Sequence, residues 1–191
     1  MDSKTNARHL RRCLGRFATG VTVVTYRGAD GFRGATMNSF TSVSLDPPLV
    51  LISVARASRT CGSIDGLPFA INVLRADQMD IAMHFAGRPR EGTRIAWDDP
   101  RDEEPPSLLD AVAVLRCRPW QRYDGGDHVL LVGEVISTAL RDGEPLVFSD
   151  GRFTTTGLPM MDGPLVLSTD RPPLPAWMGA AYRLHHHAGA G

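Results

Sequence analysis

Lysine is almost absent from this chain. Lys4 is the only lysine among 21 basic residues, and 21 acidic residues bring the formal net charge to zero at pH 7. A chain without net charge has no long-range field that would attract it to the phosphates of a nucleic acid or to an anionic membrane surface. The sequence therefore predicts no nucleic-acid partner and no membrane partner.

Cysteine is scarce too. The three cysteines, Cys13, Cys61 and Cys117, lie far apart and form no C-x-x-C pair. This excludes a dense disulfide framework and the usual spacing of a zinc site, and it is typical of reduced thiols in a cytoplasmic protein. Cys117 alternates with apolar residues, so we expect a buried thiol there. His84 lacks a second histidine one helical turn later, and no metal site is predicted.

Long apolar runs and several nucleotide-binding motifs are also missing. No run reaches the about 18 apolar residues that a membrane-spanning helix needs, and residues 1–6 lack the apolar core of a signal peptide. The Gly-x-Gly-x-x-Gly and Gly-Lys-Ser/Thr phosphate loops are absent, which excludes a Rossmann or P-loop nucleotide site. A serine at a nucleophile elbow is absent as well.

What the chain does have is a series of short β-prone segments. With 191 residues, of which 42% are hydrophobic, it is long enough for one domain with a substantial core. Strands are predicted at 21–26, 49–54, 69–74, 111–118, 128–139, 145–148 and 152–155, and helices at 5–18, 58–64 and 76–86. Many short strands with few helices predict a mainly β fold, an antiparallel barrel that is closed or partly closed.

Four regions carry more specific expectations. The strand at 49–54 is an apolar run and is predicted to be buried on both faces. Residues 88–107, rich in Arg, Asp, Glu and Pro, are predicted to form a long solvated loop. Residues 1–157 are predicted to form the folded domain. Residues 158–191, rich in Pro, Gly and Ala, are predicted to be a C-terminal extension that is partly disordered.

One segment gathers many directional side chains. Residues 36–42 hold hydroxyls, an amide and an aromatic ring, and an apolar strand follows soon after, at 49–54. Short hydroxyls and backbone N–H groups can reach the ring carbonyls, ring nitrogens and phosphates of a large planar ligand without crowding it. The alternative is an edge strand whose Ser and Thr side chains bond their own backbone. Composition leaves both interpretations open.

Two further segments could contact a ligand. Residues 53–60 place hydroxyls and two arginines where a strand ends and a short helix begins, which is typical of an anion site. The alternative, compatible with the first, is that Ser58 caps the helix. In 125–128 two glycines permit close backbone approach, and His128 begins the next strand. Its imidazole could face a second ligand, or the segment is an ordinary hairpin turn.

These segments together resemble a known family. In their order and spacing they resemble the flavin reductase family, the small reductase partners of two-component flavin-dependent monooxygenases. The resemblance covers residues 10–155 and lies in 14–25, 38–50, 69–74, 126–128, 133–135 and 145–148. The chain departs from the family pattern at Ala35 and Met37, where the residue size differs, and at Ile95, where an aromatic is common. It also departs at 154–156, where a basic or aromatic residue is often found.

The resemblance implies a fold and an activity. The fold is an antiparallel, Greek-key split β-barrel that binds FMN or FAD and works as a homodimer. The activity is that of an NAD(P)H-dependent flavin reductase, which passes a hydride from NADH or NADPH to flavin and supplies reduced flavin by diffusion to a partner monooxygenase. Two rival functions stay open. One is a flavin-binding split barrel without reductase activity, a prosthetic-group oxidase or a protein with a non-redox biosynthetic role. The other is a non-enzymatic interaction module.

The resemblance also implies roles for particular residues. Those expected to line the isoalloxazine and ribityl of the flavin are Thr36, Met37, Asn38 and Ser39. Those expected to border the ribityl and phosphate are Ser53, Val54, Ser58 and Thr60. Phe85 is expected to pack near the flavin. The nicotinamide nucleotide is expected at Gly126, Asp127 and His128, with His128 as the catalytic residue.

Overall fold

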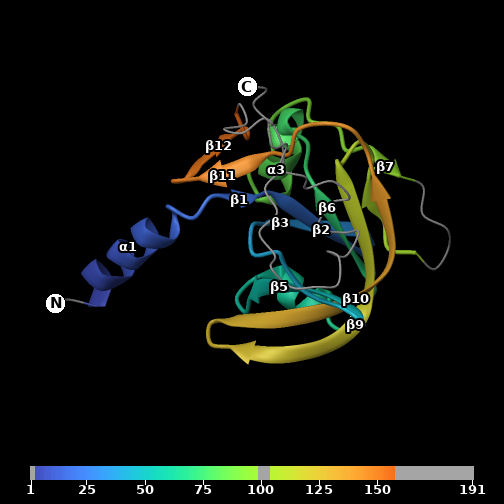
Figure 1. Cartoon of the computed structure of the whole chain (residues 1–191), viewed down its shortest axis with the longest axis horizontal. Helices are drawn as coiled ribbons and strands as arrows, with labels where there is room; N and C mark the ends of the chain where they lie inside the picture. The colour runs from blue at the N-terminus through green and yellow to red at the C-terminus, as the bar shows by residue number, and fades with distance from the viewer. Residues whose placement is uncertain (1–2, 99–103, 158–191) are drawn as a thin grey trace, which may run out of the picture. The chain divides into compact units, whose positions relative to one another are not determined.

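Seven antiparallel strands form the main sheet of the protein. The computed structural model describes residues 3–98 and 104–157, and the predicted extension 158–191 lies outside them. The strand order is β3-β2-β6-β9-β10-β5-β4, so β3 and β4 are the two edges of the sheet (Figure 1). The sheet curves into a barrel wall that is not closed within these residues. This mainly β, antiparallel architecture confirms the predicted split barrel.

Most predicted segments are found, although β9 runs on to Gly125, beyond the predicted end at 118, and β4, β7 and β8 were not predicted. The strands of the main sheet are β2 (Thr22–Gly28), β3 (Gly31–Met37), β4 (Thr41–Leu45), β5 (Pro48–Ala55), β6 (Phe69–Val73), β9 (Ala113–Gly125) and β10 (His128–Leu140). A three-stranded sheet contains β1 (Thr19–Gly20), β11 (Val147–Ser149) and β12 (Arg152–Thr154), and a separate pair is formed by β7 (Trp97–Asp98) and β8 (Ser107–Leu108). The helices are α1 (Ser3–Leu14), α2 (Arg59–Ser63), the 3₁₀ turn η1 (Ala76–Gln78) and α3 (Met79–Phe85). None of these described helices has the length and apolar character needed to cross a membrane.

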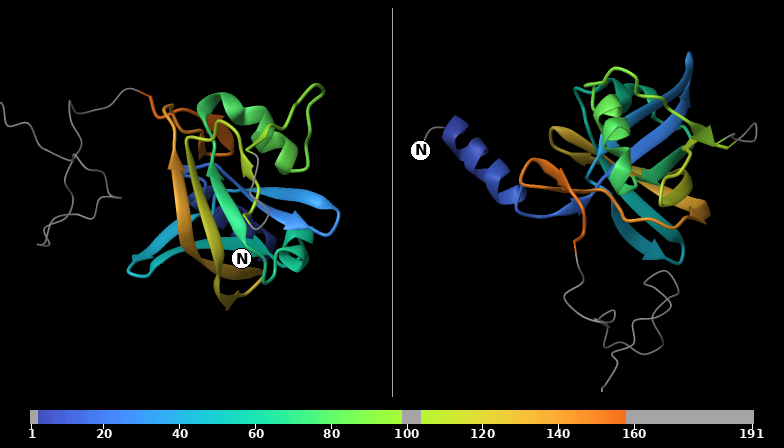
Figure 2. Two further views of the ribbon diagram at one scale, coloured as in Figure 1. Left: turned by 90° about the vertical axis from the view of Figure 1, so that its right-hand side faces the viewer. Right: turned by 90° about the horizontal axis from the view of Figure 1, so that it is seen from above.

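Two hairpins organise the sheet. Strands β2 and β3 turn between Gly28 and Gly31, where Gly31 has a φ of 111°, a conformation that glycine adopts without steric cost. Strands β9 and β10 run side by side along the sheet (Figure 2) and turn at residues 126–127. Because β10 pairs with β5 on its other side, the start of β10 lies beside the end of β5.

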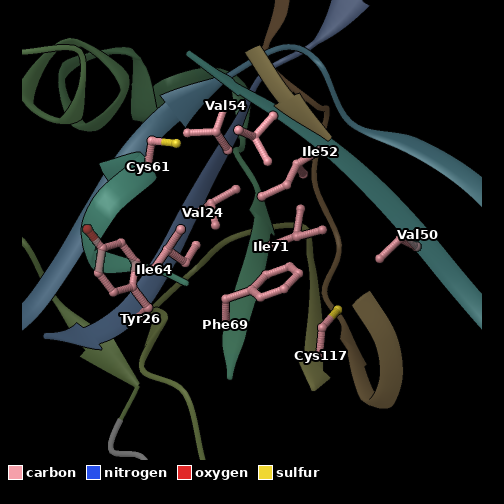
Figure 3. Packing of buried hydrophobic residues seen from close by; sticks show 11 residues of the cluster. Val24, Tyr26, Val50, Ile52, Val54, Cys61, Ile64, Phe69, Ile71 and Cys117 are labelled. Carbon is pink, nitrogen blue, oxygen red and sulfur yellow. The ribbon is translucent and has the colours of Figure 1, made fainter. Parts of the chain in front are cut away.

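The core side of β5 is formed by alternate residues. Val50, Ile52 and Val54 are buried, and Figure 3 shows Ile52 and Val54 in the same interior as Val24. The residues between them, including Leu51, are only half-buried. The prediction that 49–54 is buried on both faces is therefore wrong. In this antiparallel sheet only one face of the strand meets the core.

The segment 88–107 is not a solvated loop throughout, as the sequence predicted. At its end the chain enters β8, where Leu108 is fully buried. The Leu108 backbone N–H donates to Oδ1 of the buried Asn72 at 2.7 Å, and the Thr25 hydroxyl donates to the carbonyl of Pro106. The hydrophilic composition of the segment did not predict that its end is buried. The buried amide that bonds it, that of Asn72, lies far away in the sequence.

The N-terminal segment presents an uncovered apolar stripe, formed by Leu10 and Leu14 of α1 and by Phe17 beyond it. The spacing of Leu10, Leu14 and Phe17 predicted an amphipathic helix over 5–18, and α1 ends earlier, at Leu14. Leu10 is 56% exposed, Leu14 is 64% exposed and Phe17 is 76% exposed. Within the described residues, therefore, the stripe is not covered by the chain's own core.

The cysteines differ sharply in accessibility, which allows a simple test. Cys117 is buried, as predicted, and burial raises the pKa of its thiol to about 12. Cys61 is buried as well, whereas Cys13 is exposed. Because the thiolate is the reactive form, we expect Cys13 alone to react with an aromatic disulfide reagent in the native protein, and all three thiols after unfolding. A Cys13→Ser variant that still reacted rapidly when folded would contradict this.

Candidate ligand-binding site

Three segments that were separate in the sequence meet at one pocket. It has a volume of about 280 Å³ and lies where β3, the end of β5 and the start of β10 come together. The pairing of His128 with Ala55 places the histidine beside the last residue of β5. The predicted residues that line the pocket are Thr36, Met37, Asn38, Ser39, Ser53, Val54, Ser58, Thr60 and His128. That these residues bind a flavin stays a prediction.

A reciprocal hydrogen bond fixes two of the pocket's walls. The Ser39 hydroxyl donates to the carbonyl of Ser53 and accepts from the backbone N–H of Ser53, each at 3.0 Å. The ladder between β4 and β5 begins at the pair of Thr41 with Leu51. Ser53 lies two residues beyond Leu51 on β5, where no β4 residue pairs with the strand. The Ser39 side chain supplies the hydrogen bonds that a paired strand would make there, and so it holds residues 38–40 against β5.

The short helix α2 begins as the sequence predicted. Ser58 is its N-cap, with φ −79° and ψ 146°, and its hydroxyl accepts from the backbone N–H of Cys61 at 3.2 Å. The same hydroxyl donates to the carbonyl of Ala55 at 2.7 Å. The capping interpretation is thus confirmed. An additional contact of this segment with a phosphate is compatible with the cap and stays a prediction.

Several hydroxyls at the pocket already have backbone partners. Thr36 donates to the carbonyl of Ala82 in α3 at 2.6 Å, which ties β3 to that helix. Like the hydroxyls of Ser39 and Ser58, the Thr36 hydroxyl donates its hydrogen bond to a backbone carbonyl and not to a ligand in the pocket. Among the described residues, by contrast, no hydrogen bond engages the amide of Asn38, which is exposed at the pocket. Asn38 is therefore the side chain best placed to bond a ligand edge.

His128 is oriented by its neighbour in sequence. Its Nδ1 lies 2.7 Å from Oδ1 of Asp127. This hydrogen bond, together with the charge of the imidazole, holds the pKa of Asp127 below its usual range. With Nδ1 bonded to a carboxylate, Nε2 is the ring nitrogen left for a ligand. Gly126 and Asp127 themselves lie in the turn and do not line the pocket.

Phe85, which was expected to pack near the flavin, does not line this pocket, and its role toward a flavin stays a prediction. Its ring packs against β3, where a Cβ on Gly34 would come within 2.8 Å of it. On its other side it meets Trp97 edge-to-face, at 6.0 Å between ring centroids. The glycine in the middle of β3 was a signal for such a close approach. Phe85 therefore packs against β3, which forms one wall of the pocket, without lining the pocket itself.

Sequence reasoning missed part of the pocket and most of a second hollow beside it. Ala35 and Ala55 line the pocket, and no motif identifies a small side chain of this kind. A second hollow, of about 370 Å³, shares Asn38 and Ser39 with the first and continues toward Phe17. Together the two hollows offer room for a ligand longer than one ring system.

Comparison with known proteins places the chain among flavin reductases. The family model described as the flavin reductase like domain matches residues 14–157. The FMN reductase (NADH) SmoA of Agrobacterium fabrum is 46% identical over 149 residues, which cover 78% of this chain and 85% of that protein. The reductase component of 4-hydroxyphenylacetate 3-monooxygenase from Thermus thermophilus is 41% identical over 140 residues, covering 72% of this chain and 89% of the relative.

A solved structure gives the same result for the fold. The NADH:FAD oxidoreductase of Streptomyces globisporus superposes with a TM-score of 0.75 at 39% sequence identity, over 85% of this chain and 95% of that one. The residues that the family model matches contain the main sheet and the pocket. The chain belongs to the flavin reductase-like family.

Proposed function

We propose that this protein is an NADH-dependent flavin reductase that passes a hydride to FMN or FAD and supplies reduced flavin to a partner monooxygenase. The observation that carries the proposal is the convergence of the 36–39 and 53–60 segments with His128 on one pocket. Relatives named as NADH-dependent flavin reductases, and one named as a monooxygenase reductase component, support it.

The pocket's residues fit a flavin. Small side chains at Ala35, Ser39 and Ala55 leave space for a flat ring, and the exposed Asn38 amide can bond the ring's polar edge. Thr36 and Met37 would lie along the isoalloxazine. The ribityl and phosphate would be bordered by Ser53, Val54, Ser58 and Thr60. The hydrogen bond between Ser39 and Ser53 fixes residues 38–40 before a ligand binds. This lowers the entropic cost of ordering the pocket on binding.

The chain's part in the reaction is chiefly to position the reactants. When bound, the flavin supplies the hydride acceptor. The fixed walls set its plane, and His128, held by Asp127, presents Nε2 where a nicotinamide nucleotide can be bonded at the pocket edge. Holding two rings in reacting geometry accounts for most of the rate gain that such a site needs. No residue has to act as a general base.

We expect His128→Ala to impair the use of NADH more than the binding of flavin. Loss of one ligand hydrogen bond should raise KM for NADH about tenfold, while flavin affinity changes little. Stopped-flow hydride transfer and flavin titration measure the two effects separately. The matched control is His84→Ala, since His84 lies on α3 outside the pocket. An unchanged NADH response in the His128 variant would remove this residue from the site.

An activity matrix tests the function itself. NADH or NADPH is combined with FMN or FAD, and the absorption spectrum of the purified protein is recorded alongside. We expect NADH oxidation that depends on added flavin. A tightly held flavin without NADH oxidation would favour the prosthetic-group rival. A protein that stays colourless after incubation with flavin and desalting would favour the interaction module.

The assembly and extent of the protein belong to the same proposal. We take residues 1–157 as the reductase domain and 158–191 as an extension, in a cytoplasmic protein that forms a homodimer. The exposed stripe of Leu10, Leu14 and Phe17 supports the dimer, since an apolar face of this kind is usually covered by a partner. Light scattering coupled to size exclusion measures the oligomeric state, and a monomer at working concentration would contradict it.

A further inference from the structure

Arg56 joins two walls of the pocket from outside the ligand space. It directly follows β5, and its backbone N–H donates to the carbonyl of Asp127 at 3.0 Å. Its side-chain Nε donates to the carbonyl of Gly126 at 2.8 Å, and its Nη2 donates to the carboxylate of Asp124. One residue of the 53–60 segment thus binds the β9–β10 turn at three points.

Beyond the β9–β10 ladder, which pairs Gly125 with His128, few contacts fix the conformation of that turn. Every residue from 121 to 127 is exposed, so apolar packing does not set its shape. Inside the turn, Asp124 accepts a hydrogen bond from the backbone N–H of Gly126 at 2.9 Å, and Gly126 has a φ of 76°. The guanidinium of Arg56 is planar and presents its N–H groups in a rigid fork. Simultaneous contact with a carbonyl and a carboxylate therefore defines an orientation that a flexible ammonium group does not.

The turn leads directly to the histidine of the pocket. Arg56 holds the carbonyls of both Gly126 and Asp127, and so it fixes the point from which the Asp127 carboxylate reaches the imidazole. That carboxylate bonds Nδ1 of His128. The chain of contacts runs from β5 through Arg56 and the turn to the ring, with no gap between successive partners.

We infer that Arg56 is a positioning residue for His128, holding the 124–127 turn so that the imidazole keeps one tautomer and one place at the edge of the pocket. The inference rests on the proposed function, in which His128 faces the nicotinamide nucleotide. Arg56 acts through Asp127 and does not line the pocket. Because its Nε and Nη2 already bond the turn, we do not assign Arg56 to a cofactor phosphate, including the 2′-phosphate that distinguishes NADPH from NADH.

Arg56→Met tests this by removing the fork while keeping an unbranched side chain. We expect KM for NADH to rise about fivefold and the flavin Kd to stay within about twofold of wild type. The matched control is Arg33→Met, which breaks an Arg–Asp pair at the tip of the β2–β3 hairpin. Its two side chains are 48% and 82% exposed, against 43% and 80% for Arg56 and Asp124. We expect wild-type kinetics from the control.

Nitrogen NMR of the His128 ring gives a second readout that does not depend on activity. In the wild type, the bond to Asp127 favours the tautomer with hydrogen on Nδ1. In Arg56→Met the ring should lose that preference, and in Arg33→Met it should keep it. Arg56→Lys should lie between, because an ammonium group can replace one of the two side-chain contacts at a time.

The outcomes separate the two claims. A wild-type KM together with a wild-type His128 spectrum in Arg56→Met would overturn the positioning role. So would a loss restricted to NADPH, or a flavin Kd that rises as much as KM, since either would make Arg56 a direct ligand. If the wild-type protein reduced no flavin, the proposed function would fail, whereas the NMR comparison would still decide whether Arg56 orients His128.

Discussion

Ser39→Ala is expected to weaken flavin binding by about tenfold to a hundredfold. The serine hydroxyl satisfies both the N–H and the carbonyl of Ser53, each at 3.0 Å, and alanine satisfies neither. An unpaired, partly buried polar group costs about 1–3 kcal/mol, and about 1.4 kcal/mol corresponds to a tenfold change in affinity. Without this bond the 38–40 connection has to be ordered by the ligand itself. Fluorescence titration of FMN and FAD measures the change.

A neighbouring serine provides the control for this experiment. Ser42 lies on β4, is exposed, and its hydroxyl makes no hydrogen bond within residues 3–98 and 104–157. Ser42→Ala therefore removes the same atom without loosening the pocket and should bind flavin normally. Ser39→Thr keeps a hydroxyl and should recover part of the affinity. If Ser39→Ala and Ser42→Ala bound flavin equally well, the wall between β3 and β5 would not depend on the Ser39 bond.

Features set by neighbouring residues could be predicted from the sequence. The capping serine at position 58 defines the start of α2, because the cap bonds residues only three positions away. The turn between β2 and β3 follows from its glycines, and the strand at 69–74 from its apolar and β-branched residues. The segments around Asn38, Ser58 and His128 were each expected at a ligand site, and the structure brings them to one pocket.

Features set by distant partners could not be predicted. The contact of Arg56 with Asp124 spans 68 positions, and that of Leu108 with Asn72 spans 36. The sequence placed Arg56 in a segment typical of an anion site, and only the fold shows that a turn lies within its reach. The packing of Phe85 could not be predicted for a related reason. The residues around Phe85 give no indication of Gly34, which is distant in the sequence. Because Gly34 has no side chain, the Phe85 ring can occupy the space beside it.

Asn72→Leu is expected to lower the free energy of unfolding by about 3–5 kcal/mol, a large part of the about 5–15 kcal/mol typical of a folded domain. Asn72 is fully buried. Its Nδ2 donates to the carbonyl of Val23 at 2.8 Å and to the Thr25 hydroxyl at 2.9 Å, and its Oδ1 accepts from Leu108 N–H at 2.7 Å. Leucine has nearly the same shape but leaves these buried groups unpaired. Urea denaturation measures the loss.

A double-mutant cycle with Thr25→Val distinguishes a shared network from two independent losses. The Thr25 hydroxyl accepts from Asn72 and donates to the Pro106 carbonyl, so both side chains hold the returning segment against the sheet. Once either is replaced, the other has already lost a partner, and the double variant should be less destabilised than the sum of the single ones. Gln121→Leu, at an exposed amide on β9, should leave the denaturation midpoint nearly unchanged. Additive effects, or an Asn72 variant as stable as this control, would show that the buried amide does not hold the β8 strand in place.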